Sequence, residues 1–195
     1  AAFWEDVQHH FDKRVENEPE TFFLGNLIVE EPEAKEKNSR YRIIDGQQRI
    51  TTLFILAIAM RDKAKIKAKK SENNTLKESY LKLSTTIDEE FINYYRYANR
   101  NDRVPRLYGA AGEPFPVRDV LNFISCPERD PEKFPTKDDF PEMDGRKINA
   151  CLRRVQVAYD YFYEALEAFK DLKDFWDFKD LVDKIVFFVL RVVNE

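Results

Sequence analysis

Cysteine and histidine are scarce in this sequence, which has two of each among its 195 residues. Cys126 and Cys151 are too few and too far apart for a disulfide framework or a zinc site, so they fit a reducing, intracellular setting. His9 and His10 are adjacent, and neighbouring residues of a helix point about 100° apart, so we expect a solvated pair. The sequence therefore predicts a cytoplasmic protein without a cysteine or histidine metal centre.

Long apolar runs are also missing. No segment reaches the roughly 18 apolar residues of a membrane-spanning helix. The longest candidate, residues 53–60, is flanked by charges and is expected to be a buried helix. We find no signal peptide and expect no membrane partner. The chain begins without Met and stops on an apolar, strand-like run, so we expect it to be part of a longer protein.

Glycine is limited to five residues, whereas Phe and Tyr contribute sixteen and nine, so long regular elements around an aromatic core are expected. Charged residues make up 35% of the chain, and the formal net charge is −4. An acidic chain argues against nonspecific DNA binding over its whole surface, and it leaves room for a local basic patch.

Apolar periodicity and turn residues divide the chain into a small α/β part and a mainly helical part. We predict helices over residues 3–15, 47–70, 75–98, 116–124, 147–169 and 178–183, and strands over residues 22–29, 41–45, 104–108 and 185–193. Residues 30–40 and 126–145 are predicted surface loops. The expected fold class is α+β, with a first part over residues 1–70 and a mainly helical part over residues 71–195 that ends in a strand.

Five residues, Asp45-Gly46-Gln47-Gln48-Arg49, lie where a predicted strand runs directly into a predicted helix. Glycine permits a tight turn and a close approach by a ligand, and Asp45 is placed to cap the helix. The first N–H groups of a helix suit phosphate, and Arg49 can add a two-pronged contact. Gln47 and Gln48 each offer a donor and an acceptor for a base, a ribose or a water molecule.

The setting of this polar turn favours a ligand. The turn interrupts two strongly apolar stretches, and burying amides and an arginine beside a core is costly unless partners are supplied. Thr51, one helical turn later, is a further candidate for the same pocket. The structural alternative is a polar helix start in which Arg49 pairs with Asp45.

The string IIDGQQRITTL over residues 43–53 resembles the hallmark of the N-terminal domain of GmrSD-type, modification-dependent restriction proteins. Residues 22–29, FFLGNLIV, resemble the strand that precedes the hallmark in that family, and residues 3–7, FWEDV, resemble the helix before that strand. From residue 101 onward the chain is similar to the family only in its general helical layout.

This resemblance implies a ParB/sulfiredoxin-like α/β domain with a helical partner region. It also implies binding and hydrolysis of a nucleoside triphosphate, with ATP, GTP and CTP all open, and Mg²⁺ as a cofactor. In the family the DGQQR residues carry the nucleotide chemistry. Asp45, Gln48 and Arg49 are thereby implied as catalytic residues, Asp45 as a metal ligand, and Gly46, Gln47, Gln48 and Arg49 as nucleotide-binding residues.

The resemblance further implies coupling to the recognition and cutting of modified or foreign DNA, with an HNH-type nuclease domain in cis or on a partner chain. No His-Asn-His arrangement exists in this sequence, so the chain is not expected to cut DNA alone. The chain also begins after the family's upstream proline-tyrosine-glutamine-arginine segment. Whether it forms a homo-oligomer is left open.

Two basic stretches are candidates for nucleic-acid contact. Arg96, Arg100 and Arg103 follow a run of tyrosines, as in surfaces that stack on bases, and the alternative is a core stripe beside ordinary surface arginines. The lysine run over residues 63–70 could meet a DNA backbone, but such a run is more often a solvated helix end. The leading hypothesis is an NTP-binding and hydrolysing regulatory domain of a defence protein. The alternatives are a DNA-binding module that senses a modification without nucleotide turnover, and a purely structural domain.

Overall fold

The computed structural model describes residues 2–13, 22–30, 41–95, 103–107 and 116–192. The chain forms two compact units. The sheet unit comprises residues 1–49 and 173–195, and the helical unit comprises residues 50–172. A small sheet combined with a larger number of helices confirms the predicted α+β class. The predicted division of the chain at residue 70 stays a prediction.

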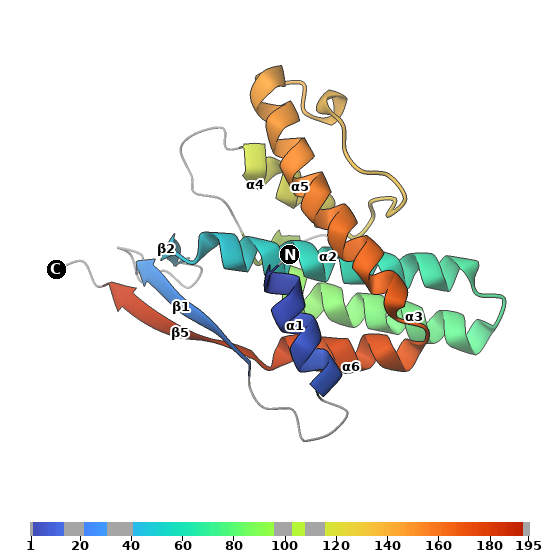
Figure 1. The fold of residues 1–195 in the computed structure, drawn as a ribbon. Coiled ribbons are helices and arrows are strands. Elements are labelled where there is room, and N and C mark those ends of the chain that lie inside the picture. The colour runs from blue at the N-terminus through green and yellow to red at the C-terminus, as the bar shows by residue number, and fades with distance from the viewer. Residues whose placement is uncertain (1, 14–21, 31–40, 96–102, 108–115, 193–195) are drawn as a thin grey trace. The chain divides into compact units, whose positions relative to one another are not determined.

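The sheet unit joins distant parts of the chain in one mixed sheet (Figure 1). It contains helix α1 (Ala2–Lys13), strands β1 (Phe22–Glu30) and β2 (Arg42–Asp45), helix α6 (Leu172–Asp183) and strand β5 (Ile185–Val192). The strand order is β2-β1-β5, with β1 antiparallel to β2 and parallel to β5. The predicted final strand therefore pairs with the first one.

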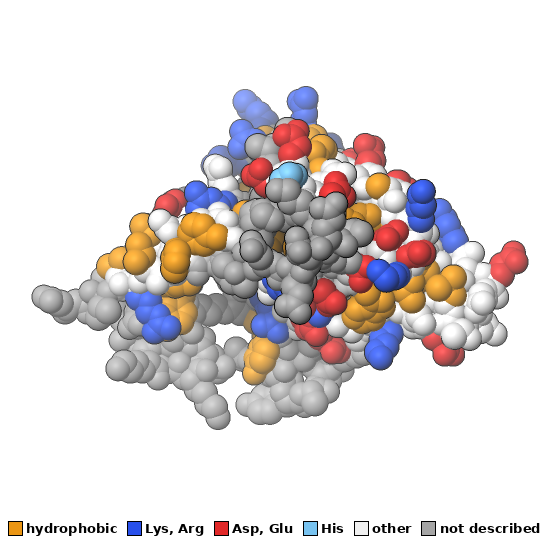
Figure 2. Space-filling view, turned by 60° about the horizontal axis from the view of Figure 1, so that its bottom comes forward, with side chains coloured by type: hydrophobic (Ala, Val, Ile, Leu, Met, Phe, Trp, Pro, Cys, Tyr) orange, Lys and Arg blue, Asp and Glu red, His pale blue; other side chains and the backbone are white. Residues whose placement is uncertain are grey.

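Aromatic packing holds the two helices of the sheet unit together. The Trp4 and Phe11 rings of α1 each lie 5.5 Å from the Phe178 ring of α6, and Phe178 is fully buried. The strands bury less of their apolar surface, because Phe188 of β5 is 68% exposed. Figure 2 shows hydrophobic side chains gathered on the surface at the side where Figure 1 draws the strands. The helix pair thus supplies most of the local core.

The helical unit is built on the helix α2 (Gln47–Lys70), whose residues 54–64 are all buried. A helix that is enclosed on every side needs apolar residues around its whole circumference, and the run from Phe54 to Met60 supplies them. The remaining elements are α3 (Asn74–Ile87), the π-helical turn η1 (Asp88–Ile92), β3 (Asn93–Tyr95), β4 (Arg103–Pro105), α4 (Pro116–Ile124), the 3₁₀ turns η4 (Lys137–Asp139) and η5 (Leu166–Ala168), and α5 (Gly145–Ala165).

One predicted helix is wrong in its second half. The helix expected over residues 75–98 ends at Ile87, continues as a π-helical turn, and gives way to strand β3 at Asn93. The Asn93 side chain is buried and donates to Asp88 at 2.8 Å and to the Ser125 carbonyl at 3.0 Å. These tertiary contacts hold residue 93 in an extended conformation that helical periodicity does not report.

The other predicted elements agree with the structure to within a few residues, except that the helix predicted over residues 178–183 begins six residues earlier, at Leu172. Residues 126–144 form the predicted irregular segment, interrupted by η4, while most of the predicted loop over residues 30–40 lies outside the described residues. The helix expected over residues 147–169 begins at Gly145 and closes with η5. Among the helices that the structure describes, none is long and apolar enough to cross a membrane.

Candidate functional site

The DGQQR turn forms where strand β2 ends at Asp45 and helix α2 begins at Gln47. Gly46 makes the turn with a φ of 88°, a conformation that favours glycine. A Cβ atom at this position would lie 2.7 Å from Cδ1 of Leu27, so the turn is packed closely on β1. The Gly46 N–H donates to Oδ1 of Asp45 at 2.8 Å, which fixes that carboxylate at the start of the helix.

A second glycine leaves space for the Arg49 side chain. Gly25 of β1 has a φ of 123°, and a Cβ atom there would lie 2.9 Å from Nη1 of Arg49. The same Nη1 donates to the Asn26 carbonyl at 3.0 Å. Arg49 is thus held against the backbone of β1, in place of the ion pair with Asp45 that the structural alternative expected.

The polar residues of the turn are exposed, contrary to the expectation that they would be buried beside the core. Gly46 is buried, whereas Asp45, Gln47, Gln48 and Arg49 are all exposed. The turn lies at the end of a strand whose own Ile44 is 48% exposed, so solvent reaches it. A ligand is therefore not needed to satisfy buried amides, and any binding at this turn must come from surface groups.

These surface groups have the chemistry of an anion site. The first turn of α2 contains no acidic side chain of its own, and the positive end of this long helix faces the turn. Among the described residues, Arg49 makes one hydrogen bond, so most of its five N–H donors stay available for phosphate oxygens. Gln47 uses its amide N–H on the Ile43 carbonyl at 2.7 Å, which orients its side-chain oxygen.

Asp45 is the one carboxylate that the DGQQR turn offers to a metal ion. Within the described residues, no group of three His, Cys, Asp or Glu side chains is arranged to hold a metal ion. Asp45 contributes a single carboxylate, and Mg²⁺ is commonly bound through one or two carboxylates together with substrate phosphates. The donor set fits a phosphate-carried ion. Thr51 lies in the helical unit and is half-buried, and its contribution stays a prediction.

The predicted nucleic-acid residues do not form an exposed cationic row in the part of the chain that the structure describes. Arg96 and Arg100 lie outside the described residues. Arg103 lies on β4, half-buried, and donates to Oδ1 of Asn93 at 3.3 Å and to Oγ of Ser125 at 2.9 Å. Arg103 is therefore used at least partly within the fold.

The first lysines of the run in α2, Lys63 and Lys65, are not solvated and do not form a surface for DNA. Both interpretations of the sequence are therefore wrong for these two residues. Lys63 is buried and binds the Tyr163 carbonyl at 3.1 Å. Lys65 donates to the Pro127 carbonyl at 2.5 Å. These ammonium groups tether the second half of α2 to α5 and to the loop after α4. Only Lys69 and Lys70 of the run are exposed.

A buried ionic cluster that sequence reasoning missed lies at the centre of the helical unit. Arg61 is fully buried, and its guanidinium donates to Asp62, to Asp88 at 3.0 Å, and to the carbonyls of Ser125 at 2.7 Å and Ile124 at 2.9 Å. Burial alone would lower the pKa of Arg61, but Asp62 and Asp88 outweigh it and raise the pKa above its usual value. Arg61 is therefore permanently charged.

Asp62 extends the cluster toward α5 and the loop after α4. Its Oδ2 accepts a hydrogen bond from the Tyr159 hydroxyl at 3.0 Å and an ion pair from Arg129. Burial, followed by the nearby Asp62 charge, raises the pKa of Tyr159, so the hydroxyl stays a donor. The one available signal was the Arg-Asp pair placed directly after the apolar run of α2.

A comparison with protein-family profiles places the sequence. The family profile of the GmrSD restriction endonuclease N-terminal domain matches residues 1–192. This chain belongs to that family. A search of curated proteins found no match. Membership extends the resemblance from the first strands and the turn to the whole helical unit, so the buried Arg61–Asp62 cluster is part of a GmrSD N-terminal domain. The family is one of modification-dependent restriction endonucleases.

Proposed function

We propose that this GmrSD N-terminal domain binds a nucleoside triphosphate at the DGQQR turn and hydrolyses it to regulate a restriction enzyme. The observation that carries the proposal is the placement of Arg49 and the N-terminus of α2 on one exposed turn, held by two glycines of positive φ. Gly25 on the neighbouring strand leaves the room in which the Arg49 guanidinium lies.

In this proposal the N–H groups of the first turn of α2 and Arg49 hold the phosphates. Asp45, whose Oδ1 is fixed by the Gly46 N–H, positions the attacking water or a metal ion, and Gln48 orients that water. Gln47 contacts the base or the ribose through its amide oxygen. Bound with the nucleotide, Mg²⁺ would neutralise phosphate charge beside Asp45.

The wider role follows from the family. We propose that nucleotide turnover is coupled to recognition of modified or foreign DNA by the whole enzyme, with the cutting done by an HNH-type nuclease domain in cis or on a partner chain. The competing hypothesis, a DNA-sensing module without turnover, predicts instead a steep salt dependence of DNA binding and no response to changes at the turn.

Calorimetric titration of the 195-residue chain with ATP, GTP and CTP in the presence of magnesium tests the proposal. Arg49→Ala should weaken binding by about 10- to 150-fold, because a charge-assisted contact contributes about 1.5–3 kcal/mol. Arg42→Ala is the matched control, since Arg42 is an exposed arginine of β2 whose side chain pairs with Glu30 at 3.5 Å. Equal affinity in wild type and Arg49→Ala, or no binding of any of the three nucleotides, contradicts the proposal.

Gly25→Ala provides a sharper version of the same test. It keeps the arginine but places a methyl group in the space that the Arg49 guanidinium occupies. The proposal expects nucleotide affinity to fall toward that of Arg49→Ala. Affinity equal to wild type in a folded Gly25→Ala variant would show that the observed position of Arg49 is not the one that binds.

A further inference from the structure

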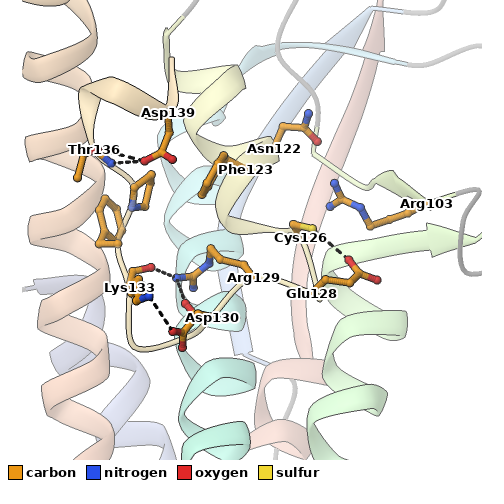
Figure 3. Close-up of a pocket in the computed structure, with 12 residues that line it drawn as sticks. Arg103, Asn122, Phe123, Cys126, Glu128, Arg129, Asp130, Lys133, Thr136 and Asp139 are labelled. Carbon is orange, nitrogen blue, oxygen red and sulfur yellow. Dashed lines mark hydrogen bonds and ion pairs between the residues drawn. The ribbon is translucent and has the colours of Figure 1, made fainter. Parts of the chain in front are cut away.

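The charged groups around the cavity beside the loop after α4 balance one another (Figure 3). The charged residues that line it are Arg103, Arg129 and Lys133 on one side of the balance and Glu128, Asp130 and Asp139 on the other. Arg129 also pairs with Asp62, and Lys133 lies 3.8 Å from Asp130. This cavity therefore offers no excess charge to a ligand. The sheet unit, by contrast, leaves large apolar side chains exposed.

One face of the sheet carries a row of these apolar side chains. Successive side chains of a strand point to opposite faces, so Phe188, Leu190 and Val192 of β5 share one face. All three are exposed, Phe188 at 68% and Leu190 at 55%. Arg191 faces the other side together with its sheet partner Val29, which is 5% exposed. The sheet thus buries Val29 on one face and exposes the apolar row on the other.

The neighbouring strands continue this exposed face. The Phe23 ring of β1 lies 4.9 Å from the Phe188 ring. Glu30 of β1 is aligned with the last residue of β5 and pairs with Arg42 of β2 at 3.5 Å, so Arg42 lies on the same face. Ile44 is two residues further along β2 and faces the same side. We call the exposed apolar side chains of this surface the open face: Phe23, Ile44, Phe188, Leu190 and Val192.

The open face is close in size to the apolar part of a protein interface. From their exposed fractions, the five side chains expose roughly 450 Å². Apolar patches beyond a few hundred Å² commonly mark interaction sites. Because about 65% of a homodimer interface is apolar, roughly 450 Å² of apolar surface corresponds to an interface of roughly 700 Å² on each partner. A standard interface buries about 800 Å² on each partner.

The open face has little charge around it. The side chains of Arg42 and Glu30 pair with each other, and the remaining charge belongs to Asp45 at the end of β2, whose Oδ1 accepts from the Gly46 N–H. A surface of this kind has no excess positive charge to attract a nucleic acid, and it repels an identical surface only weakly. A second copy of the chain presents the same apolar side chains and therefore matches the open face in both hydrophobicity and charge.

We propose that two copies of this chain form a dimer by packing their open faces against each other around a two-fold axis. A contact that uses the same patch on both copies is closed, so assembly stops at two chains. Two sheets packed face to face bury the inner side chains of both, as in a β-sandwich. The proposal does not depend on the DGQQR turn as a nucleotide site, so a negative nucleotide titration leaves it standing.

Sedimentation velocity of the 195-residue chain tests the proposal. The mass should rise from that of one chain to twice that value over the micromolar concentration range, since interfaces of standard size reach at least micromolar affinity. Because the contact is apolar, sodium chloride should not dissociate the dimer.

Two adjacent residues of β5 separate the open face from the rest of the strand. Leu190→Glu places an unpaired carboxylate in the interface twice, once from each copy, and should raise the Kd of the dimer by about 100-fold or more. Val189→Glu is the matched control, because Val189 is also exposed but points to the other face. If Leu190→Glu does not fold by circular dichroism, Ile44→Glu on β2 should dissociate the dimer in its place.

Three results would overturn the proposal. The first is the mass of a single chain, or of assemblies larger than two chains, throughout the concentration series. The second is equal dissociation by Leu190→Glu and Val189→Glu, which would indicate pairing through the edge of β5 instead of its face. The third is a dimer that neither Leu190→Glu nor Ile44→Glu weakens, which would place the contact elsewhere.

Discussion

The two polar regions of this domain differ in almost every physical respect. The DGQQR turn is exposed, rests on two glycines, and joins residues that are neighbours in the chain or lie on one adjacent strand. The cluster around Arg61 and Asp62 is fully buried and joins α2 to Asp88, to the end of α4 and to α5. The turn depends on the positive φ angles of its glycines, whereas the buried charges of the cluster depend on their hydrogen-bond and ion-pair partners.

This difference separates binding from stability. Exposed side chains such as those of the turn contribute little to folding, so they can be selected for a ligand. A buried charge that loses its partner is strongly destabilising, so the cluster cannot vary without cost to the fold. Substitutions in the cluster should therefore lower the free energy of unfolding, whereas substitutions of the exposed side chains of the turn should lower ligand affinity.

The largest effect is expected for Asp62→Ala. It removes the carboxylate shared by Arg61, Arg129 and Tyr159 and leaves buried guanidinium groups without their partner. Breaking such a buried pair costs about 3–5 kcal/mol of unfolding free energy, which urea denaturation followed by circular dichroism will measure. Glu142→Ala, at an exposed position of the loop before α5, should change stability by less than about 0.5 kcal/mol. Comparable values for the two variants would contradict the structural role of the cluster.

Gly46→Ala should have the next largest effect, because it strains the backbone of the turn. The φ of 88° and the 2.7 Å approach to Leu27 predict a loss of about 1–3 kcal/mol. Gly145→Ala is the matched control, since a Cβ atom there meets nothing within 4 Å at the start of α5. Thermal unfolding of both variants gives the comparison, and a Gly46→Ala protein as stable as wild type would rule out the described turn.

Tyr159→Phe removes one hydrogen bond from the cluster while keeping the ring. Loss of the 3.0 Å contact to Asp62 should cost about 1–2 kcal/mol, since Asp62 keeps its two arginine partners. Tyr161, on the same helix, is 41% exposed, so Tyr161→Phe should be nearly neutral in the same denaturation experiment. If the two substitutions cost the same, the Tyr159 hydroxyl is not part of the cluster.

The smallest effect on stability is expected for Arg49→Ala. Arg49 is exposed and its described hydrogen bond is to one carbonyl, so the unfolding free energy should change by less than about 1 kcal/mol. Nucleotide affinity should fall in the same protein. If Arg49→Ala is strongly destabilised and the wild type binds no nucleotide, the turn has a structural role instead.

The part of the fold that is determined locally could be predicted from the sequence. The strand that ends at Asp45, the turn at Gly46 and the helix that begins at Gln47 follow from composition and turn chemistry alone. The positive φ of Gly46 was implied by the tight turn. Exposure of the turn was not predictable, because it depends on what the sheet leaves uncovered.

The parts that depend on distant partners could not be predicted. Arg61 and Asp62 read as an ordinary charged pair until partners 27 and 97 residues away are known. Asn93 ends a helix because it bonds to Ser125, 32 residues further along the chain. The second glycine of the candidate site, Gly25, could not be linked to the turn from the sequence, because Arg49, which lies against it, is distant in the chain.

The parallel pairing of β1 with β5 has a consequence for synthesis of the protein. Residues 22–30 cannot complete their sheet until residues 185–192 have left the ribosome, whereas residues 50–172 are all available earlier. Because domains generally fold as their chain emerges, the helical unit can form first, and the strand beside the DGQQR turn gains its last neighbour at the very end of translation of these residues. A ribosome stalled before residue 185 would therefore carry the turn without its finished sheet.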